Sequence, residues 1–474
     1  MEAIQPQTDA STNDANPSPS LPTASSRTSS KSCDLLDLFA PLLSSINFQL
    51  LGPLAVGVRR KRSPGIARDC QCTVIQPPKP GSFNLVYILE FSDGVKWVIR
   101  IPLPEDGGPV PESSRSLYSE IMTTVWIRRN TSIPMPEIYD FCENSNNEIG
   151  VPYLLMEFVE GFRVCDIWFD DSGPTPKHER RLRILDNVAA AMSQLSQFQF
   201  DKIGSLHFAP RNPNPTDIGP CNVLDELGVI AAAKDDAQSG VKYQRIGPFE
   251  TSQQYFQALF RVSHEISSDS DPFFTGTLHL LKMMIEYIPR SVFPDTATPE
   301  DDHESFVLTH PDFDSQNFLV SENGTLMAVL DWDGVHTVPR CIGYDRYPGW
   351  ITRDWDPLMY GYGIGDCVEN SPEELDFYRQ HYAERMVASA SATSGFQTKS
   401  HLFEALWGAV SSPMCAPGII EKLFTHVFPS DEQDNLEEPI HFYETALGLA
   451  RGTLEKEKEL RVRKEFEKLF NIRR

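Results

Sequence analysis

Polar residues interrupt an apolar run between residues 306 and 334, and three of them have the types and spacing needed for phosphoryl transfer. Asp312 is followed five positions later by Asn317 and nineteen positions later by Asp331. A carboxylate can accept the proton of an attacking hydroxyl group, while amide and carboxylate oxygens are the ligands that Mg²⁺ prefers. Because isolated charge is costly beside a core, this cluster predicts a site that holds a metal ion and a phosphate group.

Asp312 and Asn317 could instead cap turns, since both residue types often do so. Strand-like runs on both sides favour the functional interpretation: residues 306–308 come before the loop, and FLV and MAVLDWDG follow around a turn at Gly324. The pattern predicts a hairpin whose flanking loops carry the polar groups, a common setting for functional residues. His310 is predicted to brace the loop through hydrogen bonds rather than to act as a ligand or base.

The elements that must position this loop lie upstream. NLVYILEF and VKWVIRIP alternate with period two around Ser92-Asp93-Gly94, which predicts a β-hairpin. A helix is predicted over 113–130, and GVPYLLMEFVEG predicts a buried strand that ends at Gly161. After residue 162 the pattern is mostly helical. The sequence therefore predicts a two-lobed α+β fold with a small β-rich N-lobe and a larger, mostly helical C-lobe.

Shifts in composition give the domain boundaries. Residues 1–31 are rich in Ser, Thr, Pro and Asn and are expected to be disordered, because they have few apolar side chains to offset the entropy of ordering. Residues 32–66 are predicted to form a helical leader with a basic loop. Its run RRKRS is interpreted as solvated, with a localisation signal as the alternative. Residues 67–160 form the predicted N-lobe and residues 161–474 the predicted C-lobe.

Composition excludes some classes of partner. With 42 basic and 66 acidic residues the formal net charge is -24, which argues against a nucleic-acid partner and fits either a cationic substrate or simple solubility. Nine scattered cysteines without paired CxxC spacing predict reduced thiols. We find no signal-peptide pattern and no apolar run of about 18 residues, so we expect a cytoplasmic protein with no membrane span. The oligomeric state stays open.

The segment LTHPDFDSQNFLV followed by AVLDWDG resembles the H-x-D-x-x-x-x-N and I-D-W-D/E motifs of the aminoglycoside phosphotransferase and choline kinase-like family of small-molecule kinases, particularly its fungal branch. The resemblance covers about residues 67–390. It implies a protein-kinase-like fold in which Asp312 is the catalytic base and Asn317 and Asp331 bind Mg²⁺. It also implies transfer of the γ-phosphate of ATP to a hydroxyl group of a small molecule, such as an amino sugar or amino alcohol.

The same resemblance assigns nucleotide-binding residues in the N-lobe. KPGSFNLVY would be the phosphate-covering turn, with Gly81 and Ser82 nearest the nucleotide, although a full G-x-G-x-x-G is missing. LLMEFVEG would be the hinge between the lobes, where the backbone near Glu157 and Phe158 would hold adenine.

Arg100 departs from the family pattern, because it stands where the family most often has the Lys that contacts the α- and β-phosphates. Arginine keeps the charge but has a planar fork in place of an ammonium group. Glu120 is its expected partner on the helix, with a solvated surface position as the alternative. Arg100 favours a rival function, a kinase-fold scaffold or pseudoenzyme, whereas the complete set of Asp312, Asn317 and Asp331 favours an enzyme.

A protein kinase is a less favoured rival. Asp314 stands where protein kinases commonly have Lys, and no A-P-E sequence follows Asp331. The acceptor site is expected in the segment after Asp331. There Asp333, Asp345, Asp354 and Asp356 are interleaved with Tyr344, Trp350 and Trp355 and would suit a cationic or sugar-like hydroxyl compound, with packing of the lobe as the alternative role of the aromatics. For Asp314 and Asp333 the alternative role is support of the loops alone.

Overall fold

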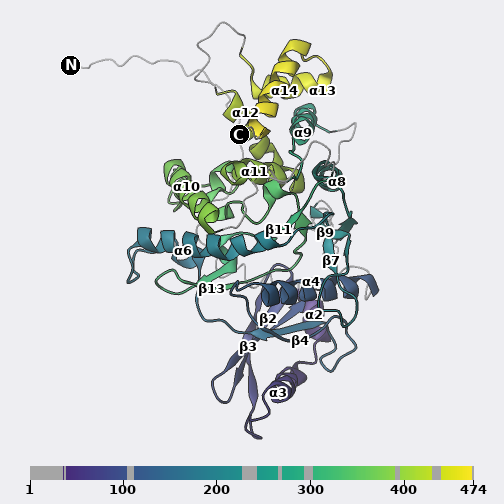
Figure 1. Ribbon diagram of the computed structural model, residues 1–474, viewed down its shortest axis with the longest axis vertical. Helices are drawn as coiled ribbons and strands as arrows, with labels where there is room; N and C mark the ends of the chain where they lie inside the picture. Colours follow the sequence, from purple (N-terminus) through teal and green to yellow (C-terminus); the bar gives the residue numbers. More distant parts are fainter. Residues whose placement is uncertain are drawn as a thin grey trace, which may run out of the picture.

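Alternating apolar residues build the centre of a five-stranded antiparallel sheet in the computed structural model of the chain (Figure 1). β2 (Asn84–Phe91) and β3 (Lys96–Pro102) bury every second side chain, including Leu85 and Ile99 at 0% exposure. Gly94 closes the hairpin with a φ of +84°, which glycine adopts without strain. The other strands are β1 (Cys72–Pro80), β4 (Ile138–Cys142) and β5 (Tyr153–Glu157), and the order across the sheet is β1-β2-β3-β5-β4.

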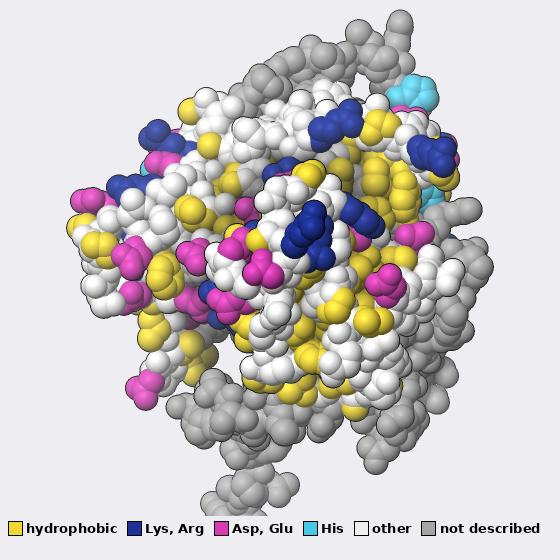
Figure 2. Space-filling view, turned by 90° about the horizontal axis from the view of Figure 1, so that it is seen from below, with side chains coloured by type: hydrophobic (Ala, Val, Ile, Leu, Met, Phe, Trp, Pro, Cys, Tyr) yellow, Lys and Arg dark blue, Asp and Glu magenta, His cyan; other side chains and the backbone are white. Residues whose placement is uncertain are grey.

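The structure describes residues 36, 39–103, 111–226, 243–264, 270–292, 303–389, 395–429 and 439–471. The predicted disordered tail, residues 1–31, lies outside the described residues. Within these ranges no helix is long and apolar enough to cross a membrane, and all eight cysteines are free thiols. Figure 2, a view of the N-lobe end, shows acidic and basic side chains interspersed over that face.

The helical leader packs against the sheet. Leu51 and Ala55 of α3 (Leu51–Arg62) are 0% exposed and share one hydrophobic core with Leu85 and Ile99, and α2 (Ala40–Ser45) adds Leu42 to it. The leader therefore covers one face of the sheet and contributes to the same core as the strands.

The basic run at 59–63 was predicted to be a solvated loop: residues 60–63 are exposed, as predicted, but the run is helical through Arg62, so the predicted loop is wrong. Its four cations form the last turn of α3. The Arg59 guanidinium pairs with Asp93 at 2.7 Å, and Arg62 pairs with Glu137. Cations at the C-terminal end of a helix offset its dipole, which explains why the helix extends through this run.

The helix α4 (Pro111–Asn130) joins the two lobes. Ile127 is 0% exposed and belongs to a C-lobe core, and the centroids of the Trp126 and Phe198 rings lie 4.4 Å apart. Beyond the helix, the N–H of Val329 donates to the Pro134 carbonyl at 2.7 Å. The C-terminal half of α4 and the segment after it are therefore packed as part of the C-lobe.

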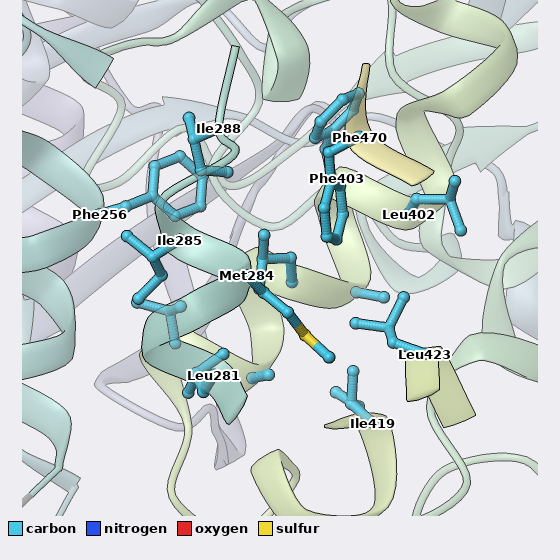
Figure 3. Packing of buried hydrophobic residues seen from close by; sticks show 14 of the residues in the cluster. Phe256, Leu281, Met284, Ile285, Ile288, Leu402, Phe403, Ile419, Leu423 and Phe470 are labelled. Atoms are coloured by element: carbon cyan, nitrogen blue, oxygen red, sulfur yellow. The ribbon is translucent and has the colours of Figure 1, made fainter. Parts of the chain in front are cut away.

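The C-lobe is mostly helical, which confirms the predicted fold class. One core lies around α6 (Lys177–Met192) and α10 (Pro372–Ser389). A second, shown in Figure 3, is built from α8 (Ser252–Ser263), α9 (Pro272–Ile285), α11 (Ser400–Ser411), α12 (Ala416–Val427), α13 (Phe442–Arg451) and α14 (Lys456–Phe470). The short strands are β6 (Phe162–Arg163), β7 (Ser205–His207), β8 (Asp217–Gly219), β9 (Cys221–Leu224), β10 (Tyr243–Ile246), β11 (Val307–Leu308), β12 (Phe318–Val320), β13 (Leu326–Val329) and β14 (Thr337–Val338).

Close packing of α9 on α13 gives a testable prediction. A Cβ added to Gly276 would lie 1.8 Å from the Ala446 carbonyl oxygen, so Gly276→Ala must push the two helices apart. We expect it to lower the free energy of unfolding by about 1–3 kcal/mol, as overpacking does. The matched control is Gly57→Ala in α3, where a Cβ meets nothing within 4 Å and should stabilise by about 0.5–1 kcal/mol. Urea denaturation measures both variants, and equal effects would contradict the packing argument.

Candidate active site

Two loops at the ends of paired strands bring the predicted site residues together. β11 pairs with β14, and the loops that follow β11 and precede β14 therefore start from the same two-stranded unit. Asp312 and Asn317 lie on the first loop and Asp331 on the second. The Leu330 N–H donates to the Asn317 carbonyl at 2.8 Å and ties the loops together. The predicted hairpin between them is confirmed as β12 paired with β13.

Asp312 is exposed, but its carboxylate is held in place by two amides. Asn317 Nδ2 donates to Asp312 Oδ2 and to the Asp312 carbonyl, each at 2.8 Å, and Gln316 Nε2 donates to the same Oδ2 at 2.9 Å. Since both side-chain bonds fall on Oδ2, Oδ1 is the oxygen through which Asp312 can accept a proton. The contribution of Gln316 was not foreseen from the sequence.

His310 cross-links the two loops from inside. It is 1% exposed, its Nε2 lies 2.7 Å from the Leu330 carbonyl oxygen, and its ring packs against Trp332 with centroids 4.8 Å apart. Burial lowers the His310 pKa to about 4, so the neutral ring donates its Nε2–H to Leu330. The structure therefore agrees with the predicted bracing role.

The buried His310 predicts a pH dependence of stability. Between pH 6.5 and 4 the unfolded chain binds a proton at this ring that the folded protein does not, so stability falls as the pH falls. The two pKa values correspond to a loss of about 3 kcal/mol over that range. His310→Gln keeps a donor but does not titrate, and we expect it to flatten the decline of the urea midpoint between pH 6.5 and 4.5. Exposed His441→Gln is the control, and parallel declines in wild type and His310→Gln would contradict the prediction.

Asp331 and Asp333 both face the N-lobe because Trp332 between them is anchored in the C-lobe. The Trp332 side chain is 3% exposed, and its Nε1 donates to the Val329 carbonyl at 3.2 Å. Asp331 has a φ of +59°, in the left-handed region that Asp tolerates better than most residues. Asp331 and Asp333, on either side of the buried Trp332, therefore both point toward the N-lobe.

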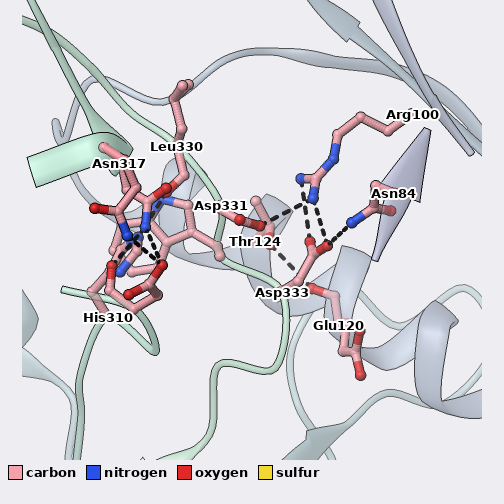
Figure 4. Close-up of polar contacts among 12 residues, drawn as sticks. Asn84, Arg100, Glu120, Thr124, His310, Asn317, Leu330, Asp331 and Asp333 are labelled. Carbon is pink, nitrogen blue, oxygen red and sulfur yellow. Dashed lines mark hydrogen bonds and ion pairs between the residues drawn. The ribbon is translucent and has the colours of Figure 1, made fainter. Parts of the chain in front are cut away.

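Arg100 meets these carboxylates from the N-lobe (Figure 4). Its NH2 donates to Asp331 Oδ1 at 3.0 Å and to Asp333 Oδ2 at 2.7 Å, and its NH1 donates to Asp333 Oδ1 at 3.4 Å. Glu120, the expected partner, lies on α4 with its carboxylate turned away from the guanidinium in Figure 4. The structure therefore gives Arg100 two C-lobe carboxylates as partners in place of the predicted helix carboxylate.

The charges of this cluster shift one another's pKa values. Desolvation lowers the Arg100 pKa, but Asp333 and Asp331 outweigh it, so the pKa is raised overall. Desolvation raises the pKa of Asp333, Arg100 lowers it in part, and the charge of Asp331 raises it again, so the net direction is upward. One guanidinium thus faces two carboxylates, and the cluster keeps an excess of negative charge that suits a cation.

The predicted phosphate-covering turn lies between β1 and β2. Gly81 and Ser82 are exposed there, and the Gly81 N–H donates to the Asn84 carbonyl at 2.8 Å, which closes the turn. Asn84 then extends its side chain to Asp333, with Nδ2 3.3 Å from Oδ2. The turn is therefore linked to the C-lobe carboxylates through Asn84, a residue that the sequence did not single out.

The predicted hinge follows β5. The Glu157 N–H donates to the Glu137 carbonyl at 2.8 Å, and the Glu157 side-chain Oε2 accepts from the Glu137 N–H at 3.0 Å. Phe158 begins the linker to β6. A Cβ on Gly161 would lie 3.1 Å from the Val320 carbonyl, so the linker passes close to β12. β6 then pairs with β12, the strand directly after Asn317. The predicted hinge is therefore followed directly by a strand that pairs with the β12–β13 hairpin.

The acidic and aromatic segment expected at the acceptor site is largely buried. Asp354 is 8% exposed and pairs with Arg379 at 2.6 Å, while Trp350 is 4% exposed. Arg379 already neutralises the charge of Asp354, so this carboxylate does not support the predicted binding of a cationic acceptor. Nearer Asp312, Arg353 pairs with Asp314 at 3.3 Å.

Comparison with known proteins gives one family. Residues 74–342 match the model of a family described as the phosphotransferase enzyme family. The subtelomeric hrmA-associated cluster protein of Aspergillus fumigatus is 24% identical over an alignment of 328 residues that covers 60% of this chain and 61% of that protein. Altered inheritance of mitochondria protein 9 of Zygosaccharomyces rouxii is 29% identical over an alignment of 324 residues that covers 56% of this chain and 49% of that protein.

This chain therefore spans about half to three fifths of the length of these curated relatives. Among solved structures, ethanolamine kinase of Plasmodium vivax aligns with a TM-score of 0.36 and 11% identity, covering 85% of this chain and 86% of that chain.

Proposed function

Since this chain belongs to the phosphotransferase enzyme family, as its motifs predicted, we propose that it transfers the γ-phosphate of ATP to a hydroxyl group of a small molecule. The observation that carries the proposal is the arrangement of Asp312, Asn317 and Asp331. One loop holds an exposed carboxylate through the Asn317 amide, and a backbone hydrogen bond ties that loop to the residue preceding Asp331. Asp312 is the base that accepts the hydroxyl proton.

The donor atoms fit Mg²⁺ bound together with a nucleotide. Asn317 uses its Nδ2 on Asp312, which leaves the amide oxygen for a metal, and Asp331 supplies a carboxylate. Among the described residues no group of three or more His, Cys, Asp and Glu could hold a metal. Mg²⁺ in phosphoryl-transfer sites is held by one or two carboxylates plus the phosphates, so Asn317 and Asp331 would be sufficient as the ligands that the protein provides. Bound there, the ion would neutralise phosphate charge.

We assign the rest of the nucleotide site to the N-lobe. Arg100 reaches the metal-side carboxylate from β3 and would contact the phosphates, with the turn at Gly81 and Ser82 above them. Adenine would lie against the linker that begins at Glu157 and Phe158. Glu120 takes no part in this proposal, because its carboxylate points away from Arg100.

An acceptor screen tests the proposal. Purified protein with ATP and Mg²⁺ is given amino sugars, amino alcohols, hydroxylated amines and uncharged polyols, and ADP release is followed with and without each compound. We expect ADP release that depends on one acceptor class, with a phosphorylated product seen by mass spectrometry. A protein that neither binds nor hydrolyses ATP with any acceptor would overturn the proposal.

A kinase-fold scaffold is the second candidate, and the observation that favours it is Arg100 in the place of Lys. Thermal shift separates the two. A ligand that binds only the folded state at 100 times its Kd stabilises by about 2.7 kcal/mol. Stabilisation by ATP that requires Mg²⁺ supports the enzyme, and indifference to both supports the scaffold.

The compartment is part of the proposal. We keep the cytoplasm, as predicted from the sequence, and the mitochondrion is the alternative because the Zygosaccharomyces rouxii relative is named as a mitochondrial protein. Imaging of the tagged full-length protein distinguishes them.

A further inference from the structure

Asp333 receives most of the contacts between the lobes at the site. Arg100 NH2 lies 2.7 Å and NH1 3.4 Å from its two oxygens, and Asn84 Nδ2 lies 3.3 Å from Oδ2. Asp331 receives one contact from Arg100, at 3.0 Å on Oδ1. Arg100 and Asn84 come from neighbouring strands of the N-lobe sheet, so both N-lobe donors converge on a single C-lobe carboxylate.

The two carboxylates have different surroundings, which points to different roles. Asp331 is tied by the backbone of its neighbour Leu330 to Asn317, the other proposed metal ligand. Asp333 lies two residues further on, with its side chain beside Arg100 and Asn84. If Asp331 binds the metal, its charge is taken by that ion, and Asp333 remains as the counter-ion of Arg100.

Arg100 needs such a counter-ion. Its side chain is 15% exposed, and a largely buried guanidinium without a carboxylate is costly. Both of its nitrogens that donate to Asp333 lie in the planar fork, so Asp333 fixes the orientation of the whole group. Glu120 points elsewhere in Figure 4.

We propose that Asp333 is a positioning residue that orients Arg100 toward the nucleotide phosphates, a role that rests on the proposed function. The carboxylate comes from the C-lobe and the cation from the N-lobe. The phosphate-contacting group is therefore in place only when the lobes approach one another, so nucleotide binding and lobe closure are coupled through this pair.

Asp333→Asn tests the proposal, because it keeps the shape and the Asn84 acceptor but removes the charge. We expect Kd for AMP-PNP with Mg²⁺, and KM for ATP, to rise about tenfold, as loss of one charge-assisted hydrogen-bonded pair predicts, while kcat falls less. Asp333→Glu should recover part of the affinity. The matched control is Asp93→Asn, which removes the surface pair with Arg59, also 2.7 Å long, and should leave binding unchanged.

A double-mutant cycle with Arg100→Gln shows whether Asp333 acts through Arg100. We expect strong non-additivity, with the double variant binding AMP-PNP about as weakly as Arg100→Gln alone. Additive losses would overturn the proposal, as would a raised Mg²⁺ requirement in Asp333→Asn, since that would make Asp333 a metal ligand. Wild-type protein that fails to bind AMP-PNP would instead refute the proposed function. Wild-type binding with an unaffected Asp333→Asn would refute the positioning role alone.

Discussion

Asp312→Ala is expected to lower acceptor-dependent ADP release by about a thousandfold while Kd for Mg²⁺ and AMP-PNP changes by less than about threefold. A positioned general base contributes about 10²–10⁴ in rate, and Asp312 presents a free Oδ1 beside the amide-held Oδ2. The loss belongs in kcat, because the base acts on the acceptor in the transition state and does not touch the nucleotide. Steady-state kinetics with the best acceptor and calorimetry with AMP-PNP measure the two quantities.

Asp314→Asn is the matched control in the same loop. Asp314 accepts from the Ser315 N–H at 2.6 Å, and an Asn oxygen can accept that bond too, so the loop should keep its shape. We expect activity within about tenfold of wild type, because this side chain only supports the loop and pairs with Arg353. If Asp312→Ala were no slower than Asp314→Asn, Asp312 would not be the base.

Asp331→Asn is expected to remove the Mg²⁺-dependent part of nucleotide binding. Asn is chosen because it tolerates the φ of +59° at this position, so the loop need not rearrange. Mg²⁺ prefers a charged oxygen ligand, and the amide oxygen is a weaker one. We expect the thermal stabilisation by ATP to become the same with and without Mg²⁺, and kcat/KM to fall by about a thousandfold, on the scale of a lost electrostatic contact to the reacting group.

Mn²⁺ supplies a further arm of the Asp331 experiment. Mn²⁺ takes the same carboxylate and carbonyl oxygen ligands, whereas Mg²⁺ demands near-ideal geometry and gives up its waters reluctantly, so Mn²⁺ should restore part of the activity of Asp331→Asn. The control residue Asp93 lies in the β2–β3 turn, at the end of the hairpin opposite Asn84, and Asp93→Asn should respond to both ions as wild type does. Persistence of full Mg²⁺-dependent stabilisation in Asp331→Asn would show that the metal is bound elsewhere.

Local patterns were sufficient to predict the fold and the position of the β12–β13 hairpin beside the candidate site. The period-two burial of β2 and β3 and the turn at Gly94 can be recognised from neighbouring residues alone. The contact between Asp312 and Asn317 is also local in sequence, since their hydrogen bond spans five positions. Signals of this range depend on strand and turn preferences that a single sequence contains.

Partnerships between distant residues were not predictable in this way. Arg100 and Asp333 are 233 positions apart, and nothing near either residue indicates the other. Asp354 was expected to face an acceptor, but Arg379, on a helix 25 positions later, neutralises it in the interior. The basic run at the end of α3 likewise depends on Asp93 and Glu137, which the fold brings close. The D-W-D alternation placed Asp333 among the candidate acidic residues, but it did not indicate Arg100 as its partner.

The attachment of α4 to the C-lobe bears on regulation. To swing outward, this helix would have to expose Ile127 and separate Trp126 from Phe198, at a cost of about 3 kcal/mol or more for two large apolar side chains. The helix is therefore held in a fixed position on the C-lobe, and any relative motion of the lobes would be a movement of the sheet and its leader helices with respect to α4. We expect an enzyme built this way to be constitutively competent, with its output set by the concentrations of its two substrates.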